Sequence, residues 1–175
     1  MKMKKFSTRK LVLVSMLIAI QVILKGFLKL EIGLNQRIAF SFIPLAINGA
    51  LFGPVVAGIS GGLADLISYL LNPTGPYFPG FTLSAILVGV IYGFFLHREK
   101  ISPAWIGLTS LGEALVNMFL GSFWLAMLYG NPFQTVFMTR LPFQIILFFV
   151  RWIVLALILD RLIKPMRQKM DKGDL

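Results

Sequence analysis

Polar side chains recur at helical spacing along four otherwise apolar stretches of this 175-residue chain. At about 100° per residue, side chains three, four, seven or eleven positions apart lie on one helix face. The groups that align in this way are Arg140, Gln144 and Arg151; Glu113, Asn117 and Trp124; Arg37 and Asn48; and Asp65, Tyr69 and Asn72. One such group alone is explained equally well by a hydrogen bond between helices. Four aligned groups favour stripes that face a common ligand-binding cavity, because polar groups in apolar surroundings are costly.

The residues that carry catalysis in other proteins do not form a recognisable pattern. His97 is the only histidine, and no carboxylate pair is placed to make it a base. The chain has no cysteine, which excludes thiolate metal sites and thiol catalysis. No His/Asp/Glu group has metal-ligand spacing, and no serine elbow motif or phosphate loop occurs. We therefore expect a binding protein without cofactor or metal, not an enzyme.

The elements that carry these stripes must be membrane-spanning helices. Hydrophobic residues make up 57% of the chain and charged ones 14%, against roughly 25% charged in soluble domains. The apolar runs reach the roughly 18 residues that a spanning helix needs. The sequence predicts one all-α domain over 1–175, a bundle of six helices with a turn at Gly53-Pro54. The expected spans are 11–28, 37–52, 55–71, 80–96, 103–128 and 132–163.

The net charge of +10 is concentrated at the two ends, 1–10 and 164–175, and in the short central loop near Arg98. Basic clusters beside apolar spans mark the cytoplasmic side. We therefore expect both termini in the cytoplasm and contact with anionic lipid headgroups in place of nucleic acid.

This topology orders the polar residues by depth. Arg37, Trp124 and Arg140 lie near the outer surface, whereas Asn48 and Glu113 lie deeper. Asp65 and Asn117 are deep as well, and Arg151 is close enough to the inner face to snorkel. The aromatic residues Tyr77, Phe78 and Phe81 lie near the mouth. Such a cavity suits an elongated aromatic ligand with an anionic end.

Two segments give the chain a family resemblance. The small-residue stretch PLAINGALFGP at 44–54, leading to GGLAD at 61–65, resembles the substrate-binding S components of energy-coupling factor transporters. The segment GPYFPGFTLSA at 75–85, with Arg37 and Asn117, resembles the folate-specific branch. The likeness extends over nearly the whole chain in length, span number and basic termini.

The resemblance implies a multi-pass protein of a prokaryotic cell membrane that captures folate or a reduced folate. It would work with a transmembrane coupling protein and two ATP-binding subunits. Folate's pterin could meet the deeper amides and carboxylates, its benzoyl ring Phe78 or Trp124, and its glutamate Arg37 or Arg140. The candidate ligand-binding residues are Arg37, Asn48, Phe78, Thr82, Glu113, Asn117, Trp124, Arg140 and Gln144. Ser15 and Ala19 stand where the family often has alanines that dock on the coupling protein.

Two alternatives remain open at this point. The chain could serve another vitamin, such as riboflavin, pantothenate or thiamine, although the cation thiamine fits poorly beside two arginines. It could also be a ligand-free membrane scaffold or morphogenesis protein. In that case the polar stripes would satisfy one another and leave no cavity.

Overall fold

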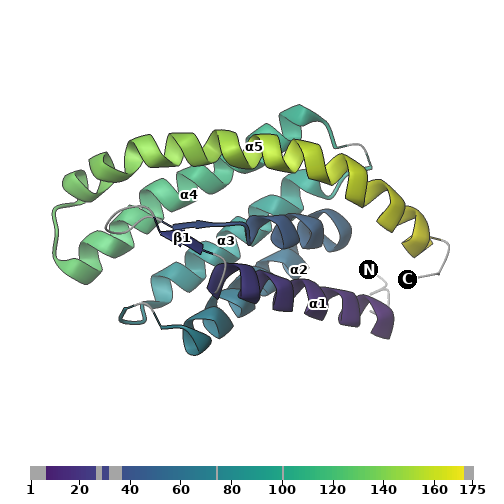
Figure 1. The fold of residues 1–175 in the computed structure, drawn as a ribbon, viewed down its shortest axis with the longest axis horizontal. Helices are drawn as coiled ribbons and strands as arrows, with labels where there is room; N and C mark the ends of the chain where they lie inside the picture. Colours follow the sequence, from purple (N-terminus) through teal and green to yellow (C-terminus); the bar gives the residue numbers. More distant parts are fainter. Residues whose placement is uncertain (1–6, 27–28, 32–36, 74, 100, 172–175) are drawn as a thin grey trace.

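The computed structural model describes residues 7–171 except 27–28, 32–36, 74 and 100. The described chain is a helical bundle with one short two-stranded ribbon (Figure 1). Its elements are α1 (Thr8–Gly26), β1 (Lys29–Glu31), β2 (Arg37–Ala39), α2 (Phe42–Leu71), α3 (Pro79–Leu96), α4 (Pro103–Tyr129) and α5 (Phe133–Asp171).

Four of these helices are long and apolar enough to cross a membrane: Phe42–Leu71, Pro79–Leu96, Pro103–Tyr129 and Phe133–Ile163. The helical membrane class is therefore confirmed. The described helices number five where six spans were expected, because the second and third expected spans form the single element α2.

Within α2 the chain reverses direction at Gly53, as the sequence predicted. Gly53 has a positive φ of 84°, which breaks the helix, and Pro54 follows it. The Asn48 amide donates a 3.3 Å hydrogen bond to the Ser60 hydroxyl. In a straight helix these residues would be about 18 Å apart. Segments 42–52 and 54–71 are thus two arms that pack against each other.

The arm 54–71 packs unusually closely against α3. A Cβ atom added to Gly89 would lie 2.2 Å from the Ala57 carbonyl oxygen, and one added to Gly93 would lie 2.2 Å from the Pro54 Cα. Backbones this close require glycine at both positions, and small residues are the usual means of helix contact in membranes. The small-residue segments of the sequence therefore form the centre of the bundle.

The ribbon is the main departure from the sequence prediction. β1 and β2 pair antiparallel, with Leu30 opposite Ile38. Arg37 accordingly lies in a strand, and the helix that it was expected to begin starts at Phe42. The described part of α1 extends to Gly26, and the expected end at residue 28 lies outside the described residues, while α5 continues past 163 to Asp171.

A different contact between elements marks each end of the bundle. At one end the Asn72 amide donates to the Gly26 carbonyl at 2.9 Å, which joins the end of α2 to the end of α1. At the other end a ring nitrogen of His97 lies 3.0 Å from the Ala50 carbonyl oxygen. The first residues of α1 and the last residues of α5 lie at this second end (Figure 1).

Candidate ligand-binding site

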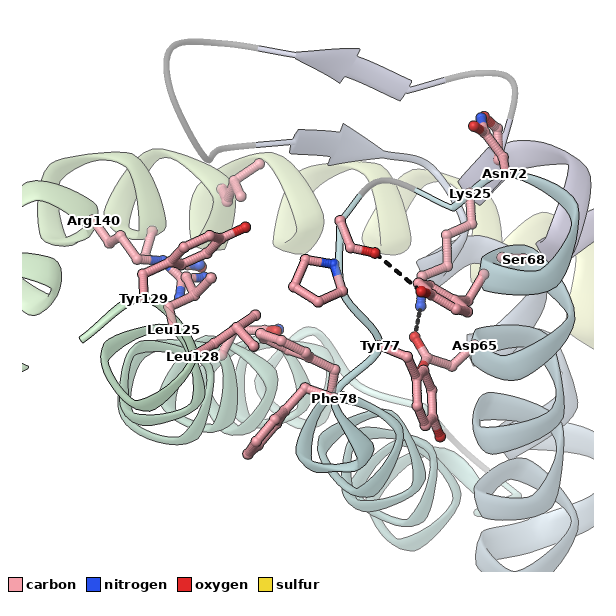
Figure 2. Close-up of a pocket in the computed structure, with 18 of the residues that line it drawn as sticks. Lys25, Asp65, Ser68, Asn72, Tyr77, Phe78, Leu125, Leu128, Tyr129 and Arg140 are labelled. Carbon is pink, nitrogen blue, oxygen red and sulfur yellow. Dashed lines mark hydrogen bonds and ion pairs between the residues drawn. The ribbon is translucent and has the colours of Figure 1, made fainter. Parts of the chain in front are cut away.

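A cavity of about 340 Å³ opens between the helices at the end where α1 meets α2. This volume falls within the roughly 300–1,000 Å³ of small-molecule sites. Figure 2 shows Arg140 and Tyr129 on one side and Lys25 and Asp65 on the other. The lining residues are Lys25, Gly26, Asp65, Ser68, Tyr69, Asn72, Gly75, Pro76, Tyr77, Phe78, Phe81, Asn117, Leu125, Leu128, Tyr129, Arg140, Gln144, Leu147 and Arg151.

One face of α5 runs along the cavity. Arg140, Gln144, Leu147 and Arg151 all line it, and they cover about 16 Å of helix. Within the described residues, Arg140 Nε and Nη1, Gln144 Oε1 and Arg151 Nη1 are buried without a hydrogen-bond partner. Buried polar groups are normally paired, so unpaired atoms on three residues that line the cavity mark this face of α5 as its least satisfied polar wall.

The Asp65 carboxylate, on the wall opposite Arg140, already has partners within the protein (Figure 2). Lys25, near the end of α1, forms an ion pair and hydrogen bond with Asp65 of α2. The Thr82 hydroxyl donates to the other Asp65 oxygen at 2.7 Å, and the Tyr77 hydroxyl lies 3.1 Å from Thr82. This network joins α1, α2, α3 and the segment before α3, and it fixes the shape of that wall.

A second internal network lies at the deep end. The Tyr92 hydroxyl donates to one Glu113 oxygen, and Arg151 Nε lies 3.2 Å from the other. Glu113 and Arg151 are only 7% and 8% exposed. The Arg151 charge is therefore balanced inside the protein, and this arginine does not snorkel to the surface.

Aromatic rings form the wall near the α2–α3 connection. The Phe78 ring centroid is 5.5 Å from that of Trp124, whose indole N–H donates to Ser84 Oγ at 3.0 Å. Tyr69 and Tyr77 pair at 5.1 Å between centroids. Phe78 thus presents a ring to the cavity that Trp124 supports from behind.

The structure brings only some of the nine candidate ligand residues to the cavity. Phe78, Asn117, Arg140 and Gln144 line it. Thr82, Glu113 and Trp124 are one layer behind, and Asn48 is fully buried against Ser60. The Arg37 side chain lies outside what the structure describes. The predicted docking residues Ser15 and Ala19 lie on an exposed face of α1.

Several cavity residues were not among the candidates. Lys25 is a charged residue in a predicted span, so the rule that selected Arg140 could have selected it. Ser68 and Tyr129 also line the cavity, but serine and tyrosine at these positions carry no distinguishing sequence signal.

Similarity in sequence and structure to known proteins identifies the family. The profile of the family "ECF transporter, substrate-specific component" matches residues 9–159. The Folate transporter FolT of Clostridium novyi (strain NT) is 37% identical over 155 residues, which cover 87% of this chain and 88% of that protein. FolT of Leuconostoc mesenteroides is 28% identical over 128 residues, covering 71% and 68%. A crystal structure of FolT bound with folic acid superimposes with a TM-score of 0.76 at 35% identity, covering 84% of this chain and 89% of that one. The chain belongs to the substrate-specific components of ECF transporters.

Proposed function

We propose that this protein captures folate at the outer face of a prokaryotic cell membrane for uptake by an ATP-driven module. The observation that carries the proposal is the match, over most of both chains, to FolT proteins and to a FolT structure that holds folic acid. The cavity described above has a volume in the small-molecule range and a mixed aromatic and polar lining, which support a ligand of this kind.

The distribution of charge supports one orientation of the ligand. Arg140 lines the cavity near the α4–α5 connection and has no ion-pair partner among the described residues, whereas Arg151 is paired with Glu113. The anionic glutamate of folate would therefore bind at Arg140, with Arg37 as a further candidate. The neutral pterin would lie deeper, near Asn117, Gln144 and Arg151, and the benzoyl ring against Phe78.

We propose six membrane crossings with both termini in the cytoplasm. The two arms of α2, one on each side of the turn at Gly53, would count as two crossings. Together with α1, α3, α4 and α5 they would make six. The start of α1 and the end of α5 lie at one end of the bundle (Figure 1), and the basic residues of 1–10 and 164–175 belong to these ends. With this arrangement the cavity would open at the outer face.

Energy for uptake would come from partner subunits, a transmembrane coupling protein and two ATPases. Ser15 and Ala19 lie one helical turn apart on the exposed face of α1, among Leu11, Val12 and Met16. Small residues on such a face allow another helix to approach closely, which supports this face as the docking surface.

Titration of the purified protein in detergent tests the proposal. Intrinsic fluorescence from Trp124, Trp105 and Trp152 reports binding, corrected for ligand absorbance. We expect saturable quenching by folic acid at near-stoichiometric concentrations, and none by thiamine, riboflavin or pantothenate at the same concentrations. Saturation by one of those vitamins in place of folic acid would reassign the substrate. Failure of all four ligands would contradict vitamin capture.

A further inference from the structure

The head of Arg140 lies against a glycine of the neighbouring helix. A Cβ atom added to Gly121 of α4 would lie 3.1 Å from Arg140 Nη1, 3.4 Å from Nη2 and 3.6 Å from Cζ. The first of these distances is shorter than ordinary van der Waals contact between carbon and nitrogen. Any side chain at position 121 would therefore meet the guanidinium before any other group.

Gly121 lies on the face of α4 that lines the cavity. Asn117 and Leu125 both line it, and each is four residues from Gly121. Gly121 itself is buried and is not a lining residue, because the guanidinium covers it. The Arg140 head thus occupies the space that a side chain at 121 would otherwise fill.

Arg140 also differs in charge balance from the other cations of the cavity. Lys25 and Arg151 each face a carboxylate, Asp65 and Glu113 respectively. Arg140 has no carboxylate partner among the described residues, and its Nε and Nη1 are buried without a hydrogen-bond partner. A partly buried cation without a counter-charge is costly, which indicates that the ligand supplies the anion.

We infer that Gly121 is a positioning residue for ligand specificity: its missing side chain holds the Arg140 guanidinium where it receives the carboxylates of the ligand. The inference rests on the proposed function, since it concerns how folate's anionic end is recognised. It goes further in assigning that recognition to a position that does not line the cavity and has no side chain.

Two ligands that differ in the charge of the tail, and otherwise by two methyl groups, test the inference. Purified parent, Gly121→Ala and Gly121→Val are titrated with folic acid and with its dimethyl ester, whose tail is neutral. We expect Gly121→Val to lower the affinity for folic acid about tenfold, which corresponds to the loss of one charge-assisted hydrogen bond. The affinity for the ester should stay unchanged. Gly121→Ala should have a smaller effect in the same direction, because a methyl group displaces the guanidinium by only a few tenths of an ångström.

A matched control comes from the same pair of helices. A Cβ atom at Gly107 of α4 would lie 3.5 Å from the Trp152 ring of α5, which is ordinary contact, so Gly107→Ala should change neither affinity. In an Arg140→Lys background the slimmer ammonium should tolerate Gly121→Val, with no further loss of folic acid. That background also provides a readout if Gly121→Val does not fold with Arg140 present.

The outcomes separate the inference from the function on which it rests. If the variants at position 121 lower the affinity for both ligands equally, or for neither, Gly121 does not position Arg140 and the inference is overturned. If Gly121→Val costs as much in the Arg140→Lys background as in the parent, it acts through packing and the inference also fails. If the parent binds no folic acid, the proposed function fails first and takes the inference with it.

Discussion

Replacing Glu113 with leucine should destabilise the protein strongly. Glu113 is 7% exposed; it accepts a hydrogen bond from the Tyr92 hydroxyl and forms an ion pair with Arg151, which is itself 8% exposed. Removing one partner of a buried ion pair costs about 3–5 kcal/mol, because the other charge stays buried without compensation. For a chain of this size each kcal/mol lowers the unfolding midpoint by about 2–4 °C, so Glu113→Leu should lower it by roughly 6–20 °C.

Thermal unfolding in detergent, followed by tryptophan fluorescence, measures this loss. Glu99→Leu is the control, since Glu99 is an exposed acid in the short loop after α3 and should shift the midpoint little. The triple variant Tyr92→Phe/Glu113→Leu/Arg151→Met replaces the whole network with apolar groups and should recover most of the midpoint. It should nevertheless bind folic acid more weakly than the parent does, because Arg151, which it replaces, lines the cavity.

Two results would refute this reasoning. A Glu113→Leu protein that unfolds at the temperature of the parent would show that Glu113 does not compensate Arg151. A triple variant with full folic acid affinity would show that the deep end of the cavity does not contact the ligand.

Four further predictions address other parts of the molecule. Arg140→Ala should weaken folic acid about 10- to 150-fold in the fluorescence titration, and unchanged affinity would place the anionic end elsewhere. Phe78→Ala should speed folic acid release more than it slows capture in stopped-flow measurements; equal effects on both rates would argue against a wall that retains the ligand. Ser15→Trp should leave binding by the isolated protein intact but abolish ATP-dependent uptake with all partner subunits, whereas loss of both would indicate internal packing. Gly53→Ala should cost about 1–3 kcal/mol of stability because of the positive φ, while Gly26→Ala, whose added Cβ would contact nothing within 4 Å, should not.

Much of the fold was predictable because its determinants are local. A glycine followed by a proline predicted the reversal at Gly53, and long apolar runs predicted the helices. The ribbon was not predictable, since strands of three residues are too short to show an alternating pattern. This is why Arg37 was assigned to a helix and the start of α2 was placed five residues early.

The site was predictable only where the periodicity of a single helix decides it. Arg140 and Gln144 share a face of α5, and both reach the cavity. Asn48 and Glu113 have the same polar character, but each finds a partner inside the protein, Ser60 and Arg151 respectively. Which polar groups pair with one another and which stay open depends on distances between helices, and spacing along one helix does not contain those distances.

The folded-back form of α2 has a consequence for how the chain enters the bilayer during synthesis. The arm 42–52 is about 16 Å long, roughly half of the 30 Å hydrocarbon core, so it cannot complete a crossing as an independent helix. Its one amide, on Asn48, donates to Ser60, which lies on the other arm. We therefore expect the first arm to insert together with the second, as a hairpin.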